Sequence, residues 1–192
     1  EEEQISGKQM TIPVILLRAG VAEASGMGNV IVDHEKMGEL LARKILEEQP
    51  KEKPVYVLVD SAVQSDMDRL FLKGVDAVFA EEERNAQRIM RHEEDRFWMM
   101  LERTGMHEPE EVVILAENQE ILTEAAGVLA GSEAVFSAVA GLYGRGTTMS
   151  ILNYLDRGLI KGICVTDEFS LGYYSVREAV RALEGAGSVP TV

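Results

Sequence analysis

Short apolar runs alternate with amphipathic stretches along the chain, and no other feature of the sequence constrains the fold as strongly. The runs at 12–17, 55–60 and 112–116 are almost entirely apolar. Strands of this kind are buried on both faces, which is typical of parallel sheets covered by crossover helices. The stretches between them carry apolar residues at helical spacing. The sequence therefore predicts an α/β fold, an open parallel sheet with helices on both faces in a Rossmann-like arrangement.

The same alternation predicts where the elements lie. Strands are expected at 12–17, 29–32, 55–60, 112–116, 134–140 and 162–166. Helices are expected at 35–48, 120–130, 149–157 and 173–184, with another around 70–79. Residues 81–104 keep a helical pattern, so no strand is expected there. Trp98, Met99 and Met100 form either a binding stripe or a packing contact, and packing is favoured because Met and Trp fill irregular gaps.

The charge of the chain argues against nucleic acid as a partner. Its 192 residues carry a formal net charge of −14. Binding a phosphate backbone requires clustered Lys and Arg, whereas Arg84, Arg88 and Arg91 are interleaved with glutamates. The chain contains no run of about 18 uncharged apolar residues, so no transmembrane helix is expected. The acidic start at 1–3 is unlike a signal peptide, so no export signal is expected within this sequence.

Catalytic chemistry is not expected from the reactive side chains. His34, His92 and His107 lack the spacing of metal ligands. Cys164, the single cysteine, lies within an apolar strand where a buried, inert thiol is expected. No nucleophile elbow and no pairing of a nucleophile with a base is evident. The sequence thus predicts no catalytic residue, no metal and no cofactor.

Polar residues follow several expected strands, which is where ligands collect in open α/β sheets. These positions are Arg18, 60–61, 117–119, 141–148 and 166–168. Their mixed charge suits a small polar molecule, such as a sugar, held by hydrogen bonds. A nicotinamide or flavin site stays open as an alternative, because 141–148 is expected to form a glycine-rich loop and Asp167 follows about twenty residues later. Met149, however, stands where the dinucleotide fingerprint needs glycine.

The stretch 144–173 resembles the carboxyl end of type 1 periplasmic sugar-binding proteins. That family has a Gly-rich turn, a helix ending in Leu-x-x-Gly-x-Ile, a strand, a polar corner and then Gly-Tyr at a helix; the second and last of these are found here at 155–160 and 172–173. Residues 12–16 resemble the last strand of the family's amino-terminal lobe, and 30–33 followed by Gly38 resemble the crossing into the second lobe. Effector domains of lac-repressor-type regulators share this fold.

The resemblance implies a set of ligand contacts. Asn118 matches the Asn that meets the sugar, Arg69 matches the sugar-binding Arg at a helix start, and Thr166 matches the polar corner residue. Arg18 closes a strand where the family often has Asp, and Gly146 stands where sugar binders carry a ligand-binding Asp. The implied ligand-binding residues are Arg18, Arg69, Asn118, Gly144, Arg145, Gly146, Thr147, Thr166 and Asp167.

These departures imply a more positive site, because an Asp is absent at Gly146 and arginines are present at Arg18 and Arg145. A sugar acid or another anionic ligand is therefore a hypothesis alongside a neutral sugar, since Arg binds carboxylates bidentately. Family members are longer than this chain. The resemblance implies that 29–192 form the carboxy-terminal ligand-binding lobe, and that 1–28 are a remnant of the amino-terminal lobe and the crossover.

Three functions stay open. The favoured one is a solute-binding protein for import or sensing outside the cytoplasm, with a carbohydrate or sugar-acid ligand and a membrane permease or a second copy as partner. The second is the effector-binding domain of a cytoplasmic lac-repressor-type regulator, which is expected to be a homodimer. The third is a nucleotide-cofactor-dependent enzyme.

Overall fold

The computed structural model describes residues 14–17, 27–60, 65–104 and 111–183. By its contacts the chain divides into two compact units, one formed by 1–33 together with 166–192, and the other by 34–165. They are called the smaller and the larger unit below.

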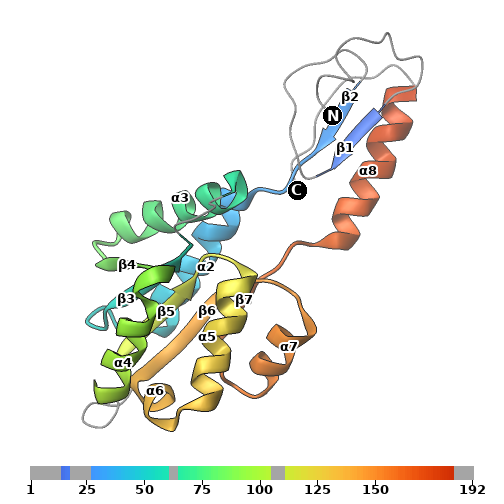
Figure 1. Ribbon diagram of the computed structural model, residues 1–192. Helices are drawn as coiled ribbons and strands as arrows, with labels where there is room; N and C mark the ends of the chain where they lie inside the picture. Colours follow the sequence, from blue (N-terminus) through green and yellow to red (C-terminus); the bar gives the residue numbers. More distant parts are fainter. Residues whose placement is uncertain (1–13, 18–26, 61–64, 105–110, 184–192) are drawn as a thin grey trace. The chain divides into compact units, whose positions relative to one another are not determined.

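The larger unit is built on a five-stranded parallel sheet (Figure 1). Its strands are β3 (Val55–Val59), β4 (Ala86–Met90), β5 (Val112–Ala116), β6 (Val139–Arg145) and β7 (Gly162–Cys164). They lie in the order β4-β3-β5-β6-β7, and every pairing is parallel. The predicted open parallel α/β sheet is confirmed.

Helices cover both faces of this sheet because both faces of its strands are apolar. Val55, Val57 and Val59 of β3 pack in one cluster with α2 (His34–Glu48) and α3 (Asp66–Glu81). Leu58 packs in the second cluster, on the other face. That cluster includes residues of the remaining helices of the unit, which are α4 (Glu94–Thr104), α5 (Gln119–Gly131), α6 (Glu133–Ala138) and α7 (Met149–Asp156).

Helices α2 and α3 approach each other closely at two glycines. A Cβ atom on Gly38 would lie 2.0 Å from the backbone O of Phe71, and one on Gly74 would lie 1.9 Å from the backbone O of Glu35. Neither position has room for a side chain, and the displaced atoms would be backbone. Each glycine is therefore required by the contact between the two backbones.

Strand β4 corrects the expectation that 81–104 is helical throughout. Helix α3 ends where Glu83 adopts a left-handed φ of 51°, and the chain then pairs with β3 from Ala86 to Met90. A short 3-10 turn, Arg91–Glu93, follows before α4. β4 lies at the edge of the sheet, where Gln87 and Arg88 are exposed, so the strand lacks the apolar run of a central strand.

The strand expected at 134–140 begins later than predicted. Ser132 caps α6 by accepting a hydrogen bond from Val135 N at 3.4 Å, so the first part of this apolar run is helical. β6 then extends to Arg145, which means that most of the expected glycine-rich loop is strand. Gly141 and Gly144 are needed for packing, because Cβ atoms there would lie 2.6 Å from the Tyr143 ring and 3.0 Å from Leu122.

The apolar side chains of α4 divide between the core and solvent. Phe97 and Leu101 are buried, and Trp98 packs against the core cluster, as expected. Met99 and Met100, in contrast, are 55% and 43% exposed, so the packing interpretation is wrong for these two residues.

In the smaller unit, β1 (Val14–Leu17) and β2 (Met27–Val30) pair in parallel, and α8 (Glu168–Leu183) contacts both. Residues 166–192 thus group with 1–33, whereas the sequence placed them in the lobe 29–192. α8 buries Leu171 and Glu178. Its exposed apolar residues recur at helical spacing and are Phe169, Tyr173, Val176, Val180 and Leu183.

Candidate functional site

Arg145 lies at the centre of a polar network at the carboxyl ends of β3, β5 and β6. It is the last residue of β6, and its side chain is 13% exposed. The guanidinium forms an ion pair with Asp68 of α3. Its Nε donates to the backbone O of Glu117 at 2.7 Å, and its Cζ lies 4.9 Å from the centroid of the Phe71 ring. Separate elements on the two sides of Arg145 therefore fix its position.

The start of α3 directs Asp68 toward Arg145. Ser65 is the N-cap residue, and its Oγ accepts a hydrogen bond from Asp68 N at 3.2 Å. In return, Ser65 N donates to Oδ2 of Asp68 at 3.0 Å, which completes a capping box. The box occupies one carboxylate oxygen and leaves Oδ1 for Arg145. Asp68 is only 11% exposed, so the ion pair is largely shielded from water.

Glu117 links the ends of three strands. It follows β5 and is fully buried. Its Oε1 accepts a hydrogen bond from the backbone N of Asp60, after β3, at 2.5 Å. Its backbone O accepts from Arg145, at the end of β6. The carboxyl ends of β3, β5 and β6 are consequently held together by one acidic residue.

Arg91 extends the network to the edge strand β4. Its Nη1 donates to Asp60 at 2.9 Å. Its Nη2 donates to Glu120 at 3.2 Å and to Glu124 at 2.7 Å. These bonds, the one to Asp60 first, raise the pKa of Arg91. Burial, followed by the charge of Glu124, raises the pKa of Glu94 close by.

The buried charge of Arg145 is balanced within the protein. Burial lowers the pKa of its guanidinium, and the Asp68 carboxylate beside it favours the charged form. An arginine already paired to a buried carboxylate offers little net positive charge to a ligand. This pairing removes Arg145 as a reason to expect an anionic ligand.

Two hydrogen-bond donors at the strand ends have no partner among the described residues. Asn118 is the N-cap residue of α5, and its Oδ1 accepts from Ile121 N at 3.0 Å. Its Nδ2 donates to no described residue, and the same holds for Nη1 of Arg145. Arg145 donates to the backbone O of Glu117, the residue directly before Asn118 in the chain. Both groups can donate to a hydroxyl oxygen of a ligand.

Other predicted contacts in the larger unit have different surroundings. Arg69 lies on the exposed side of α3 and forms an ion pair with Asp66, apart from the Arg145 network. Gly144 is buried within β6, and Thr147 is exposed after it. Gly146 has a φ of 139°, and a Cβ there would lie 2.6 Å from the Cβ of Gln119. The aspartate that sugar binders carry at this position would therefore not fit.

Thr166 and Asp167 belong to the smaller unit. Asp167 precedes α8, and its Oδ1 accepts a hydrogen bond from Ser170 N at 3.0 Å. Its Oδ2 accepts from Ser170 Oγ at 2.7 Å. These bonds lower the pKa of Asp167. Arg18 lies outside the described residues.

Asp68 and Arg91 belong to the network but were not predicted from the sequence as site residues. Asp68 had a signal, because Ser65 three residues earlier matches the spacing of a capping box. No sequence pattern indicated Arg91, since it lies in a stretch that was expected to be one solvated helix. Its role depends on β4, which aligns it with the end of β3.

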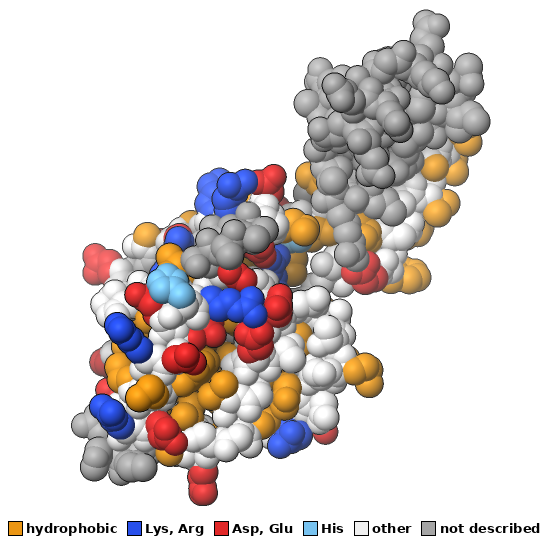
Figure 2. Space-filling view, viewed as in Figure 1, with side chains coloured by type: hydrophobic (Ala, Val, Ile, Leu, Met, Phe, Trp, Pro, Cys, Tyr) orange, Lys and Arg blue, Asp and Glu red, His pale blue; other side chains and the backbone are white. Residues whose placement is uncertain are grey.

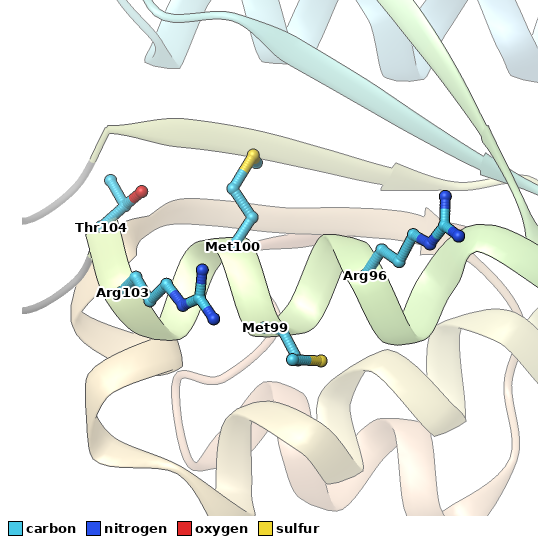
Figure 3. A pocket seen from close by; sticks show the side chains of 5 residues that line it. All are labelled: Arg96, Met99, Met100, Arg103 and Thr104. Carbon is cyan, nitrogen blue, oxygen red and sulfur yellow. The ribbon is translucent and has the colours of Figure 1, made fainter.

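The described residues contain no group of His, Cys, Asp and Glu arranged to hold a metal ion. No helix of the described part of the chain has the length and apolar character needed to cross a membrane. A hollow of about 330 Å³ is present on α4 (Figure 3), and none of the described residues lining it is a predicted contact. The Arg145 network is therefore the candidate site, and the α4 hollow is a separate feature.

The sequence matches the family described as "Periplasmic binding protein domain" over residues 6–187. No functionally curated protein matches the chain. A glucose-galactose binding protein from Geobacillus stearothermophilus, GanP, is similar in structure, with a TM-score of 0.70 and 16% identity over 94% of this chain and 65% of that one. The chain thus spans slightly less than two thirds of the length of GanP.

Two further solved structures represent transport and regulation. A carbohydrate transporter solute binding protein from Agrobacterium radiobacter, in complex with D-arabinose, has a TM-score of 0.65 and 16% identity over 94% of this chain and 63% of that one. A protein assigned as a LacI transcriptional regulator from Bacteroides fragilis has a TM-score of 0.70 and 14% identity over 94% of this chain and 64% of that one. At these identities the likeness extends to the fold alone.

Proposed function

Because the chain belongs to the periplasmic binding protein domain family, we propose that it binds a small neutral sugar, without altering it, at the carboxyl ends of the strands of the larger unit. Carbohydrate binding is supported by the similar structures, which include a glucose-galactose binding protein and solute binding proteins with D-arabinose and tagatopyranose. These ligands carry no charge.

The proposal rests on which groups of Arg145 are already bonded within the protein. Its charge is matched by Asp68, its Nε is occupied by Glu117, and one remaining nitrogen, Nη1, has no described partner. A sugar acid would need a cation that is not already paired. A neutral hydroxyl needs only a well-placed donor, which Nη1 of Arg145 and Nδ2 of Asn118 supply. The balance of charge favours a neutral sugar over a sugar acid.

We propose that the other predicted binding residues contact the same sugar. We place Arg145 and Asn118 at the centre of the site, with Thr147 and the backbone around Gly144 and Gly146 beside them. Arg69 would join them if its exposed ion pair with Asp66 opens, which costs little at an exposed position. Thr166, Asp167 and Arg18 are proposed contacts outside the larger unit.

We propose import of a solute outside the cytoplasm as the role of the chain, with a membrane permease as its partner; the periplasmic location in the family description supports the first of these. The alternative is the effector domain of a regulator, which the LacI-type structure favours and which would act in the cytoplasm as a homodimer. The matched family and these similar structures are binding proteins rather than enzymes. A dinucleotide site is not retained, because the glycines at 141 and 144 are part of β6.

Ligand binding is tested by thermal unfolding and calorimetry with a panel of sugars. We expect a neutral sugar among L-arabinose, D-xylose, D-glucose and D-galactose to raise the unfolding temperature of the chain, by an amount that grows with concentration. D-Galacturonate and D-glucuronate are expected to bind more weakly. Stronger binding of either acid, or no stabilisation by any neutral sugar in the panel, would contradict the proposal.

Two variants locate the site while sparing the fold. Asn118→Asp keeps the oxygen that caps α5 and removes the Nδ2 donor, and Arg145→Lys keeps the charge opposite Asp68 and removes Nη1. Each should raise the Kd for the best sugar by about three- to tenfold, the value of one hydrogen bond. Arg43→Gln, which breaks an exposed ion pair with Glu81, is the matched control and should leave the Kd unchanged. Equal effects of all three variants would place the site elsewhere.

A further inference from the structure

Arg91 is not among the proposed sugar contacts, but it is bonded to two elements that flank them. It directly follows β4, whose last residue, Met90, pairs with Val59 at the end of β3. This register places Arg91 level with Asp60, the residue after β3. Its Nη1 donates to Oδ2 of Asp60 at 2.9 Å, and the Asp60 side chain is only 17% exposed. The carboxyl end of β3 is therefore tied to the edge strand by a partly shielded ion pair.

The other half of the Arg91 guanidinium reaches α5. Its Nη2 donates to Oε1 of Glu120 at 3.2 Å and to Oε1 of Glu124 at 2.7 Å. Both carboxylates lie on the first turns of α5, whose N-cap residue is Asn118. Figure 2 shows acidic side chains gathered around basic ones over the start of this helix. One planar guanidinium thus joins the end of β3 to the helix that follows the proposed Nδ2 donor of Asn118.

These bonds form a closed ring, which consists of Arg91, Asp60, Glu117 and Glu120. Arg91 binds the side chains of Asp60 and Glu120. The backbone N of Asp60 donates to Oε1 of Glu117 at 2.5 Å, and Glu117 lies three residues before Glu120 in the chain. Glu117 also accepts from Nε of Arg145 through its backbone O at 2.7 Å. The ring and the Arg145 network therefore share one fully buried residue, so a change in the ring reaches the proposed sugar site.

The start of α5 is held from two sides of the sheet. A Cβ on Gly146, after β6, would lie 2.6 Å from the Cβ of Gln119, the first residue of α5, so the helix has no room to move toward β6. Arg91 comes from β4, which lies on the other side of β5 in the strand order. Without Arg91, α5 loses its side-chain anchor on the β4 side. A donor at the start of the helix then has to be ordered by the ligand itself, at a cost in affinity.

We infer that Arg91 is a positioning residue of the sugar site, which holds the Nδ2 donor of Asn118 in place by joining Asp60 to α5. Three carboxylates surround its single charge, so Arg91 itself attracts no anion. Its contacts with Glu120 and Glu124 are exposed, and exposed ion pairs add little to stability, so their effect is on the position of α5. The inference rests on the proposed function, because a positioned donor changes affinity only where a ligand uses it.

The test compares Arg91→Met, which removes the charge and keeps an unbranched side chain, with Arg88→Met as the matched control. Arg88 lies on β4 and forms one exposed ion pair, with Asp76. In calorimetry with the neutral sugar that binds the wild-type chain best, Arg91→Met should raise the Kd by about three- to tenfold, and Arg88→Met should leave it unchanged. Arg91→Lys should restore part of the affinity, because an ammonium keeps the charge but lacks the fork that reaches three carboxylates. Equal Kd values for Arg91→Met and the wild-type chain would overturn the inference.

A double-mutant cycle separates positioning from a general loss of structure. Glu120→Gln/Glu124→Gln removes the α5 side of the contact and should raise the Kd by a similar factor. When Arg91→Met is added to this variant, the Kd should rise by less than the product of the two separate effects, because both changes act through the same contact. Separate effects that simply multiply would show that Arg91 does not act through α5, and the inference would be wrong.

Amide hydrogen exchange, measured by NMR on the chain without sugar, tests the ring by itself. The backbone N–H of Asp60 is bonded within the ring, and that of Ile121 is bonded to the N-cap side chain of α5. Arg91→Met should accelerate exchange at both amides by about tenfold, whereas Arg88→Met should not. Unchanged exchange at these amides in Arg91→Met would overturn the inference even if a sugar binds. A wild-type chain that binds no sugar would contradict the proposed function, and the exchange rates would then decide separately whether Arg91 positions the start of α5.

Discussion

Asp68 is the residue on which the strand-end network depends most. It faces the N-cap of its own helix with one carboxylate oxygen and the guanidinium of Arg145 with the other. Both members of the ion pair are largely buried, with exposures of 11% and 13%. A buried pair of this kind contributes little net stability, but removal of one member leaves an uncompensated charge in the interior.

Asp68→Asn should therefore lower the free energy of unfolding by about 3 kcal/mol, because Arg145 loses its counter-charge. Urea titration followed by circular dichroism measures the change. The matched control is Glu81→Gln, which breaks the exposed ion pair with Arg43 and should change the free energy by at most about 1 kcal/mol. If both substitutions cost the same, the Asp68–Arg145 pair is not buried in solution.

Tyr143 gives the stability of the larger unit a dependence on alkaline pH. Its side chain is fully buried, and its hydroxyl accepts from Gln49 at 2.8 Å and donates to Glu48 at 3.0 Å. Burial raises the pKa of Tyr143 from 10.0 to about 12. A group whose pKa is raised on folding stabilises the protein below its unfolded pKa, and this contribution is lost as pH rises through the folded value.

Between pH 10 and 12 the free energy of unfolding should consequently fall by roughly 2 to 3 kcal/mol on account of this residue. Tyr143→Phe removes the titrating group, so the variant should lose stability less steeply over the same interval. Chemical denaturation of both proteins at a series of pH values makes the comparison. Parallel pH profiles would contradict the prediction, because they would mean that folding does not raise the pKa of Tyr143.

Among the elements, α2 and α3 form the most tightly constrained pair. Their backbones meet at Gly38 and Gly74, where a Cβ would lie 2.0 Å and 1.9 Å from a carbonyl oxygen of the other helix. Overpacking of this kind forces the helices apart and disturbs the cluster that they form on the sheet.

Gly38→Ala should destabilise the chain by about 1–3 kcal/mol, although alanine is the better helix former. Gly127→Ala in α5 is the matched control, since its nearest neighbour beyond the helix would be the Tyr154 hydroxyl at 3.8 Å. That substitution should raise stability by about 0.4–1 kcal/mol. Thermal unfolding distinguishes the two directions, and a stabilising Gly38→Ala would contradict the close contact.

The central elements could be predicted from the sequence, and the edge elements could not. β3 and β5 are buried on both faces, so their apolar runs are continuous. β4 pairs on one side only and tolerates Gln87 and Arg88, and the turn before it uses Glu83 at φ 51° in place of a glycine. No local pattern marks such a strand. The error removed Arg91 from the predicted site, because only the β3–β4 pairing brings it beside Asp60.

The position of a predicted binding residue could be inferred from the sequence where it depends on the strands alone. Its ion-pair partner could not be inferred where that partner comes from a distant helix. Arg145 ends β6 and Asn118 lies two residues after β5, so the parallel sheet places both at the carboxyl ends of its strands. The partner that neutralises Arg145 comes from α3, which no strand-end rule indicates. The ligand's charge could therefore not be inferred from the sequence, since it depends on a tertiary ion pair.

At the scale of the whole molecule, the larger unit is one continuous segment, 34–165, with its own two apolar clusters. The smaller unit carries the exposed apolar residues of α8, from Phe169 to Leu183. Exposed apolar stripes promote association between copies. The two units should accordingly differ in their behaviour in solution.

A protein consisting of residues 34–165 should fold alone and unfold cooperatively. It should also stay monomeric at concentrations where the full chain associates, because it lacks α8. Circular dichroism with denaturant measures the first property, and sedimentation velocity measures the second. A fragment without a cooperative transition would mean that the larger unit needs 1–33 or 166–192 to fold.

The division of the smaller unit between the two ends of the chain has a consequence for biosynthesis. β1 and β2 leave the ribosome before residues 34–165, and α8, which contacts both strands, leaves it after them. The larger unit can fold as soon as it has emerged, whereas the two strands must wait until α8 has been synthesised. A chaperone acting on the nascent chain would therefore be needed at β1 and β2 before α8 emerges.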